Sequence, residues 1–93
     1  MHKATKRFWE LYYVLPNDIQ QAASKQFSLL GANPRHGSVQ FKKIDIVAGQ
    51  ELWSARVNLQ YRALAYKRSD TYTWFWIGEH RAYEQLIRGH IRP

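Results

Sequence analysis

The spacing of the apolar residues in this chain of 93 residues changes abruptly at the break between Pro34 and Gly37. Before the break, apolar side chains recur every three or four residues, as on one face of a helix. After the break they alternate with polar residues, as on a strand with one buried face. Helices followed by strands predict an α+β fold, and the length predicts a single domain over residues 1–93.

Two helices are expected before the break, joined as a hairpin. The first has four apolar positions at i, i+3, i+4 and i+7: Phe8, Leu11, Tyr12 and Leu15. Thr5 is a suitable N-cap for it, and Pro16 ends it. The second helix carries its apolar residues on one face and stops before Pro34: Ile19, Ala22, Ala23, Phe27 and Leu30.

About four strands follow, near residues 39–44, 51–57, 61–67 and 71–77, and residues 80–88 read as a short closing helix. Their short links predict a mainly antiparallel meander packed on the helical hairpin. If a three-residue loop pairs Val57 with Tyr61, Arg56 and Arg62 lie opposite each other on one face. A two-residue turn would pair Arg56 with Tyr61 and separate the two arginines.

The charge is strongly positive and concentrated in the middle of the chain. Fourteen Lys and Arg against seven Asp and Glu give +7, with a pI near 10.0. The segment from Arg35 to Arg68 contains seven basic and two acidic residues, a net charge of 7 − 2 = +5. This excess favours a polyanionic partner, such as nucleic acid, an acidic protein segment or anionic lipid.

Several classes of function are disfavoured. The chain has no cysteine for a disulfide or a thiolate zinc site, and its four histidines lack the spacing of metal ligands: His2, His36, His80 and His90. Neither a Gly-rich phosphate loop nor a G-x-S-x-G elbow is present, which argues against nucleotide hydrolysis and acyl transfer. No apolar run could span a bilayer and no signal peptide is apparent, so we expect a cytoplasmic protein without metal or cofactor.

The remaining chemistry suits RNA cleavage without a metal ion. His80 can exchange a proton near neutral pH, and Tyr83, one helical turn later, can orient the ribose or stack on a base. Arg62 is the main candidate for holding the phosphate. Further phosphate contacts are expected from basic residues of the strands and the last helix: Arg56, Lys42, Lys43 and Arg81.

Each candidate also has a structural alternative. His80 could cap the last helix, and Tyr83 could simply pack on the sheet. Strand alternation predicts that Trp74 and Trp76 share one face and that Phe75 and Ile77 share the other, so at least one pair belongs to the core.

Three segments, "LLGANPRHGSVQFKKI", "ELWSARVNLQYRALAY" and "WFWIGEHRAYEQLI", together resemble the RelE/ParE superfamily of toxins from bacterial type II toxin–antitoxin modules. "YRAL" is similar to a family strand with a Tyr-Arg pair, and "IGEHRAY" to the closing Gly-x-His segment of the ribonuclease members. The resemblance implies a curved antiparallel sheet on two helices with a concave basic face. This chain departs from many members in an expected start directly at the first helix, without an N-terminal strand.

The resemblance implies a ribosome-associated messenger-RNA endoribonuclease neutralised by an acidic antitoxin. Arg62 matches the phosphate-binding arginine, and His80 and Tyr83 match a segment that holds a catalytic His or Tyr in several members. Arg56 and Lys43 match in general character alone. The ParE branch, which inhibits DNA gyrase by binding protein, shares the fold, so a non-enzymatic toxin and an inactive basic RNA- or protein-binding domain stay open as alternatives.

Overall fold

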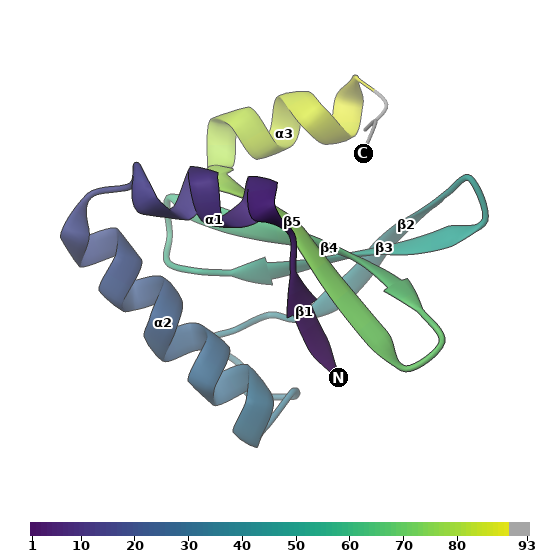
Figure 1. The fold of residues 1–93 in the computed structure, drawn as a ribbon, viewed down its shortest axis with the longest axis horizontal. Helices are drawn as coiled ribbons and strands as arrows, with labels where there is room; N and C mark the ends of the chain where they lie inside the picture. The colour runs from purple at the N-terminus through teal and green to yellow at the C-terminus, as the bar shows by residue number, and fades with distance from the viewer. Residues whose placement is uncertain (90–93) are drawn as a thin grey trace.

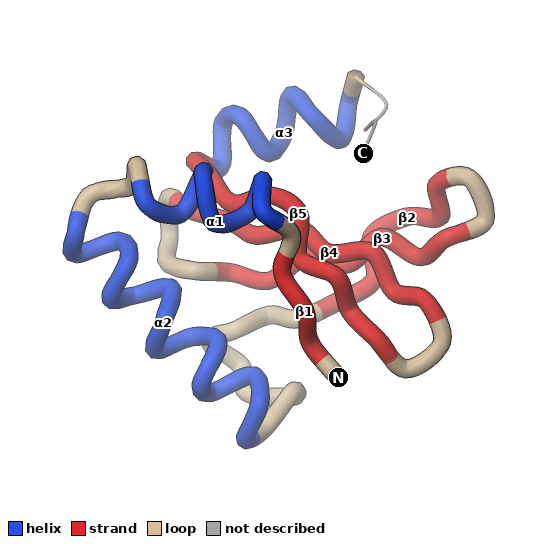
Figure 2. The backbone as a smooth tube through the Cα atoms, viewed as in Figure 1, coloured by secondary structure: helices blue, strands red, loops and turns tan. Residues whose placement is uncertain are grey.

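The computed structural model describes residues 1–89, so His90 lies outside the described part of the chain. Its elements are β1 (His2–Ala4), α1 (Lys6–Tyr13), α2 (Asn17–Ala32), β2 (Lys42–Val47), β3 (Gln50–Arg56), β4 (Tyr61–Arg68), β5 (Thr71–Glu79) and α3 (His80–Arg88). The strands form one sheet in the order β1-β5-β4-β3-β2, in which β2 to β5 are antiparallel neighbours. Figures 1 and 2 show that the sheet is twisted. The predicted α+β class and meander are confirmed.

The expectation that the chain begins directly with the first helix is wrong, and the sheet has five strands rather than four. His2–Ala4 form β1, which pairs in parallel with Tyr72–Trp74 of β5. Backbone bonds continue on both sides of this pairing, from Tyr72 N to Met1 O (2.8 Å) and from Thr5 N to Trp74 O (2.9 Å). Three residues are too few for alternation to mark a strand, and their partner segment lies at the far end of the chain.

The two N-terminal helices cover one face of the sheet, called here the helix face. Thr5 caps α1 as predicted, because its Oγ1 accepts a hydrogen bond of 3.0 Å from Phe8 N. Beneath the helices the strands present small side chains, and Ala55, Ala63 and Ala65 are all buried. Within residues 1–89, no helix has both the length and the apolar character needed to cross a membrane.

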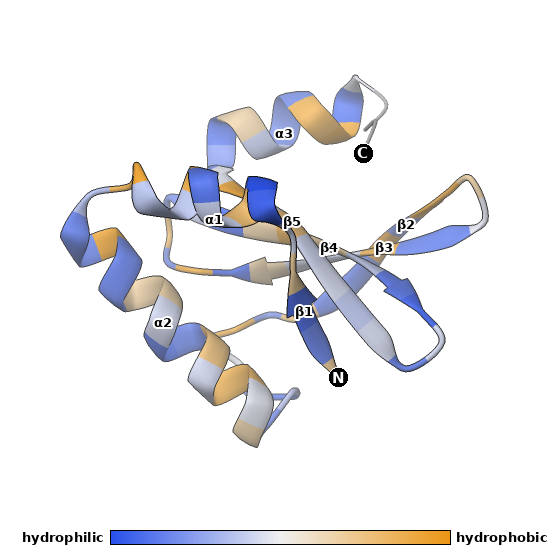
Figure 3. Ribbon diagram, viewed as in Figure 1, coloured by the Kyte–Doolittle hydropathy of each residue, from blue (hydrophilic) through white to orange (hydrophobic). Residues whose placement is uncertain are grey.

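The opposite face of the sheet, called here the α3 face, has its own apolar cluster. Leu52, Leu64 and Tyr66 from the sheet are buried there with Tyr83 of α3, and Leu86 packs against them. Figure 3 shows apolar and polar segments alternating along α3, as expected for a helix with one buried side. The α3 face is therefore covered by one short helix, and partly buried apolar residues of the sheet complete its cluster: Ile44, Val47, Phe75 and Trp76.

The prediction that Trp74 and Trp76 share a face is wrong. Leu64 lies opposite Trp76 but Ala65 lies opposite Trp74, so β5 contains an extra residue, Phe75. This β-bulge shifts the alternation by one. Trp74 joins the core under the helices together with Ile77, whereas Phe75 and Trp76 pack on the α3 face.

The hairpin between β3 and β4 has the register that the three-residue loop predicted. Val57 N donates to Tyr61 O at 3.0 Å, and Arg56 lies opposite Arg62. Asn58 stabilises the loop because its Oδ1 accepts bonds from Gln60 N (2.8 Å) and Tyr61 N (3.0 Å). Both arginines therefore point to the α3 face, at the end of the sheet where α3 begins.

Candidate functional site

A cavity of about 120 Å³ opens on the α3 face, at the junction between the sheet and α3. Its lining comes from the segment entering β2, from β2, β3 and β4, and from the first turn of α3: Gln40, Lys42, Ser54, Arg56, Arg62, His80 and Tyr83. The cavity brings together three formal cations, one histidine and one tyrosine. It contains five of the seven residues that the sequence suggested.

Arg62 is held in place by the loop before it. Its Nη1 donates to the backbone oxygens of Asn58 (2.6 Å) and Tyr61 (3.0 Å). Burial lowers the pKa of Arg62, the facing Arg56 lowers it further, and Tyr83 acts in the opposite direction. An arginine remains charged under these influences, so the site holds a fixed, partly desolvated cation.

Lys42 reaches the same cavity through an unusual backbone conformation just before β2. Gln40 has a φ of +47°, in the left-handed region. Beyond it, Phe41 packs into the core of the helix face while Lys42 lies opposite Ser54. The turn at Gln40 thus directs Lys42 toward Arg56, which follows Ser54 on the same face of β3.

His80 and Tyr83 enter the cavity from the first turn of α3. His80 N donates to Gln60 O at 2.6 Å, which ties the start of the helix to the loop that orients Arg62. The side chain of His80 does not cap the helix, because Glu79 is the N-cap residue. Its ring centroid lies 5.6 Å from that of Tyr83.

Tyr83 packs on the sheet, as its structural alternative predicted, and it also lines the cavity. Its ring is buried in the cluster of the α3 face. Packing in the cluster therefore fixes the position of Tyr83 at the wall of the cavity.

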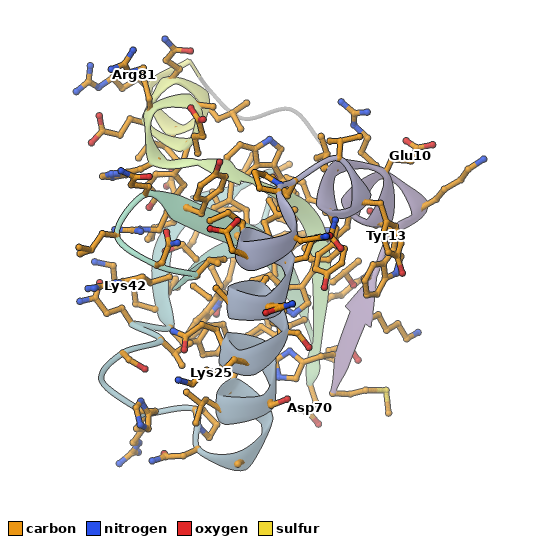
Figure 4. All side chains as sticks on the ribbon, turned by 90° about the vertical axis from the view of Figure 1, so that its left-hand side faces the viewer. Glu10, Tyr13, Lys25, Lys42, Asp70 and Arg81 are labelled. Atoms are coloured by element: carbon orange, nitrogen blue, oxygen red, sulfur yellow. The ribbon has the colours of Figure 1, made fainter. Side chains whose placement is uncertain are left out.

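Two of the proposed phosphate contacts lie elsewhere. Lys43 lies opposite Trp53, whose ring packs against Phe41 and Tyr72 of the helix face, so Lys43 belongs to the side away from the cavity. Arg81 is exposed on α3 and does not line the cavity. Figure 4 shows Arg81 and Lys42 on the same flank of the molecule, opposite Tyr13 on α1. Arg81 therefore adds positive charge near this flank without direct access to the cavity.

Sequence reasoning missed three residues at the site. Ser54 could have been found, because it precedes Arg56 by two positions and so shares its face of the strand. Glu84 also had a signal, since it follows His80 by four positions on a predicted helix, and its Oε1 lies 3.3 Å from His80 Nε2. Gln40 had none, because a positive φ at a non-glycine residue is set by the surrounding fold.

The arrangement suits a phosphodiester bound across the end of the sheet. Three cations can surround one phosphate group, and His80 lies beside them as a group that can donate or accept a proton. Within residues 1–89, Lys42, Arg56 and Arg62 form no ion pair with a carboxylate. Their positive charge is therefore not neutralised by the described part of the protein.

Comparison with known proteins relates this architecture to earlier structures. No family model matches the sequence, and no curated protein matches it. Solved structures with the same architecture include the archaeal RelE–RelB complex from Pyrococcus horikoshii OT3, with a TM-score of 0.65 at 15% identity over 84% of this chain and 91% of that chain. This chain has a RelE-like fold.

Two further structures extend the RelE-like match. YafQ from E. coli strain BL21(DE3) has a TM-score of 0.68 at 10% identity, over 89% of this chain and 96% of that one. The RelB–RelE antitoxin–toxin complex from Methanococcus jannaschii has a TM-score of 0.67 at 14% identity, over 90% and 96%. The similarity covers nearly the whole RelE-like domain, and at these identities it concerns the fold alone.

Proposed function

We propose that this chain is the toxin component of a type II toxin–antitoxin module and that it cleaves messenger RNA at the ribosome without a metal ion. The observation that carries the proposal is the cavity in which Lys42, Arg56 and Arg62 meet His80 and Tyr83. The fold it shares with an antitoxin–toxin complex supports the biological setting.

In the proposed reaction, the 2′-oxygen of a ribose attacks the adjacent phosphorus. The new bond joins the 2′-oxygen to phosphorus, the bond from phosphorus to the 5′-oxygen breaks, and the proton of the 2′-hydroxyl passes to water. His80 gives a proton to the departing 5′-oxygen. The products carry a 2′,3′-cyclic phosphate and a 5′-hydroxyl.

The other residues stabilise the charge and the geometry of this step. Arg62 and Arg56 bind the non-bridging phosphate oxygens, where negative charge increases in the transition state, and Lys42 adds to that field. Tyr83 positions the ribose or stacks on an unstacked base. The cavity has room for one phosphate group, so neighbouring nucleotides would lie along the basic flank that includes Arg81.

A cognate antitoxin of acidic character is the partner we propose for the free toxin. The net charge of +7 provides the electrostatic attraction for such a partner. The described carboxylates leave the cations of the cavity unpaired, so an acidic segment lying over the cavity would neutralise them and exclude RNA.

The test is expression of the wild type and single variants in bacteria, followed by mapping of new message ends and of their chemistry. His80→Ala is expected to lower the cleavage rate about 10²- to 10⁴-fold, as for loss of a general acid. Arg62→Ala is expected to lower it about 10²- to 10³-fold. Lys25→Ala removes one charge from α2, away from the cavity, and serves as the control.

A non-enzymatic toxin that binds a protein such as DNA gyrase is the second candidate. The observation that favours it is the exposed aromatic side of α1, where Trp9 and Tyr13 are 44% and 68% exposed and their rings stack with centroids 5.8 Å apart. Growth arrest that persists in a His80→Ala, Arg62→Ala double variant without new message ends would replace the nuclease proposal with this one.

A further inference from the structure

One carboxylate contacts the histidine of the cavity. Glu84 lies one helical turn after His80 on α3, and its Oε1 is 3.3 Å from His80 Nε2. Its second oxygen, Oε2, lies 4.0 Å from Nη2 of Arg88, another turn along the helix. The Glu84 carboxylate thus lies between the imidazole ring of His80 and the guanidinium group of Arg88.

This carboxylate lies beside a ring whose other charged neighbours in the cavity are cations. Three cations line the cavity beside the ring: Lys42 from β2, Arg56 from β3 and Arg62 from β4. The remaining titratable side chain of the cavity is Tyr83, whose ring centroid lies 5.6 Å from that of His80. Glu84 therefore supplies the negative charge that the other described neighbours of the ring lack.

The contact also distinguishes the two ring nitrogens. With Nε2 directed at Glu84, a proton on Nε2 is stabilised, and Nδ1 is the nitrogen left for a ligand. No hydrogen bond of His80 Nδ1 occurs within residues 1–89. The ring itself lines the cavity, whereas Glu84 does not.

We propose that Glu84 is a positioning residue that holds His80 in the tautomer protonated at Nε2, so that Nδ1 is the atom that exchanges the catalytic proton. This inference rests on the proposed nuclease function and extends it to a residue outside the cavity. In the reaction, the proton on Nδ1 passes to the 5′-oxygen while the proton on Nε2 stays directed at Glu84. The electron pair of the broken bond remains on the 5′-oxygen.

The first test measures the ring without any substrate. Nitrogen-15 spectra of the His80 imidazole, recorded well above the pH at which histidine titrates, report which nitrogen carries the proton. The wild type is expected to show the Nε2-protonated form, and Glu84→Ala a mixture of both tautomers. Identical tautomer populations in the two proteins would overturn the proposal, whether or not the chain is a nuclease.

The second test measures cleavage of ribosome-bound message. Glu84→Ala is expected to lower kcat about fivefold with little change in KM, because a partly exposed pair, here 39% and 46% exposed, contributes at most about 1 kcal/mol. Glu84→Asp should recover part of the rate. Glu10→Ala removes the same charge from another partly exposed helical ion pair, that of Glu10 with Arg7 on α1, and it is the matched control because Glu10 does not line the cavity.

These results separate the two proposals. A wild type that leaves message intact, or a His80→Ala variant as fast as the wild type, refutes the nuclease function, and the spectra still report on Glu84. If the wild type is active and Glu84→Ala has the same kcat, the positioning role is refuted while the nuclease function stands. A fall that appears in KM rather than kcat would also refute it, because that would mean a role in binding.

Discussion

Arg56→Gln is expected to make the protein more stable, although it removes a residue of the site. Arg56 and Arg62 lie directly opposite each other on adjacent strands. Within residues 1–89 no carboxylate pairs with either of them, and Arg56 acts on the pKa of Arg62 as a like charge does. Like charges in this position repel, and the repulsion is present whenever the sheet is folded.

The magnitude follows from the geometry of the pair. A directly opposed cross-strand pair contributes about 0.2–1 kcal/mol, so relief of the repulsion should raise the free energy of unfolding by about 0.5 kcal/mol. For a domain of this size, that corresponds to an increase in Tm of about 2–4 °C. Salt should stabilise the wild type more than the variant, since screening weakens the repulsion that the variant lacks.

Urea denaturation is the suitable assay because urea is uncharged and leaves the ionic strength unchanged. Arg81→Gln is the matched control, as Arg81 is exposed on α3 and lines no cavity. The inferred repulsion is refuted if Arg56→Gln is less stable than the wild type, or if its stability responds to salt as that of Arg81→Gln does. Either result would mean that Arg56 and Arg62 do not repel each other measurably in the folded protein.

The same variant should bind RNA less well, which links stability to function. Loss of one phosphate contact is expected to reduce the slope of log K against log salt by about 0.7 for a single-stranded RNA. A more stable but weaker-binding protein is the signature of a site in which cations have been brought together for a ligand.

Three further predictions concern positions around the site and the new strand. Tyr66→Phe should stabilise the protein by about 1 kcal/mol in urea denaturation, because the buried hydroxyl has no partner within residues 1–89, and a loss of stability would show that the hydroxyl is bonded. Gly78→Ala should cost about 1–3 kcal/mol, since a Cβ there would lie 2.7 Å and 2.9 Å from two ring atoms of Trp76; an equal cost in a Trp76→Ala background would contradict this cause. Burial and the nearby chain amine lower the pKa of His2, so the unfolded chain takes up the proton first and stability should fall as pH drops below about 6.5. His2→Gln should lack that dependence in denaturation curves measured between about pH 7 and pH 5.

The sequence allowed accurate prediction where a pattern repeats over many residues. The helices follow from apolar residues at helical spacing, and the facing of Arg56 and Arg62 follows from the loop that pairs Val57 with Tyr61. The gathering of both arginines with His80 was also within reach, because the hairpin and the start of the last helix meet at one end of the sheet.

The features that sequence reasoning missed arise from contacts distant along the chain. Parallel pairing with β5, rather than any local pattern, makes His2–Ala4 a strand. The bulge at Phe75 reverses the face of every residue beyond it, and nothing in a run of aromatic residues marks the extra position. The register of β2 against β3 decides that Lys42 rather than Lys43 lies on the face of the cavity. The sequence does not reveal this register, because nothing in either strand fixes which residues pair.

The parallel pairing of β1 also orders events during synthesis. Its hydrogen bonds join Met1 and Thr5 to Tyr72 and Trp74, so a growing chain cannot form them until β5 has left the ribosome. During the earlier part of synthesis His2–Ala4 therefore stay unpaired, and β5 has no neighbour on that edge until they pair with it. His80 follows directly after β5, so the basic cavity is completed soon after the last strand of the sheet is made. Nascent chains of this protein therefore acquire the pairing of β1 with β5 and the complete cavity at nearly the same point of synthesis.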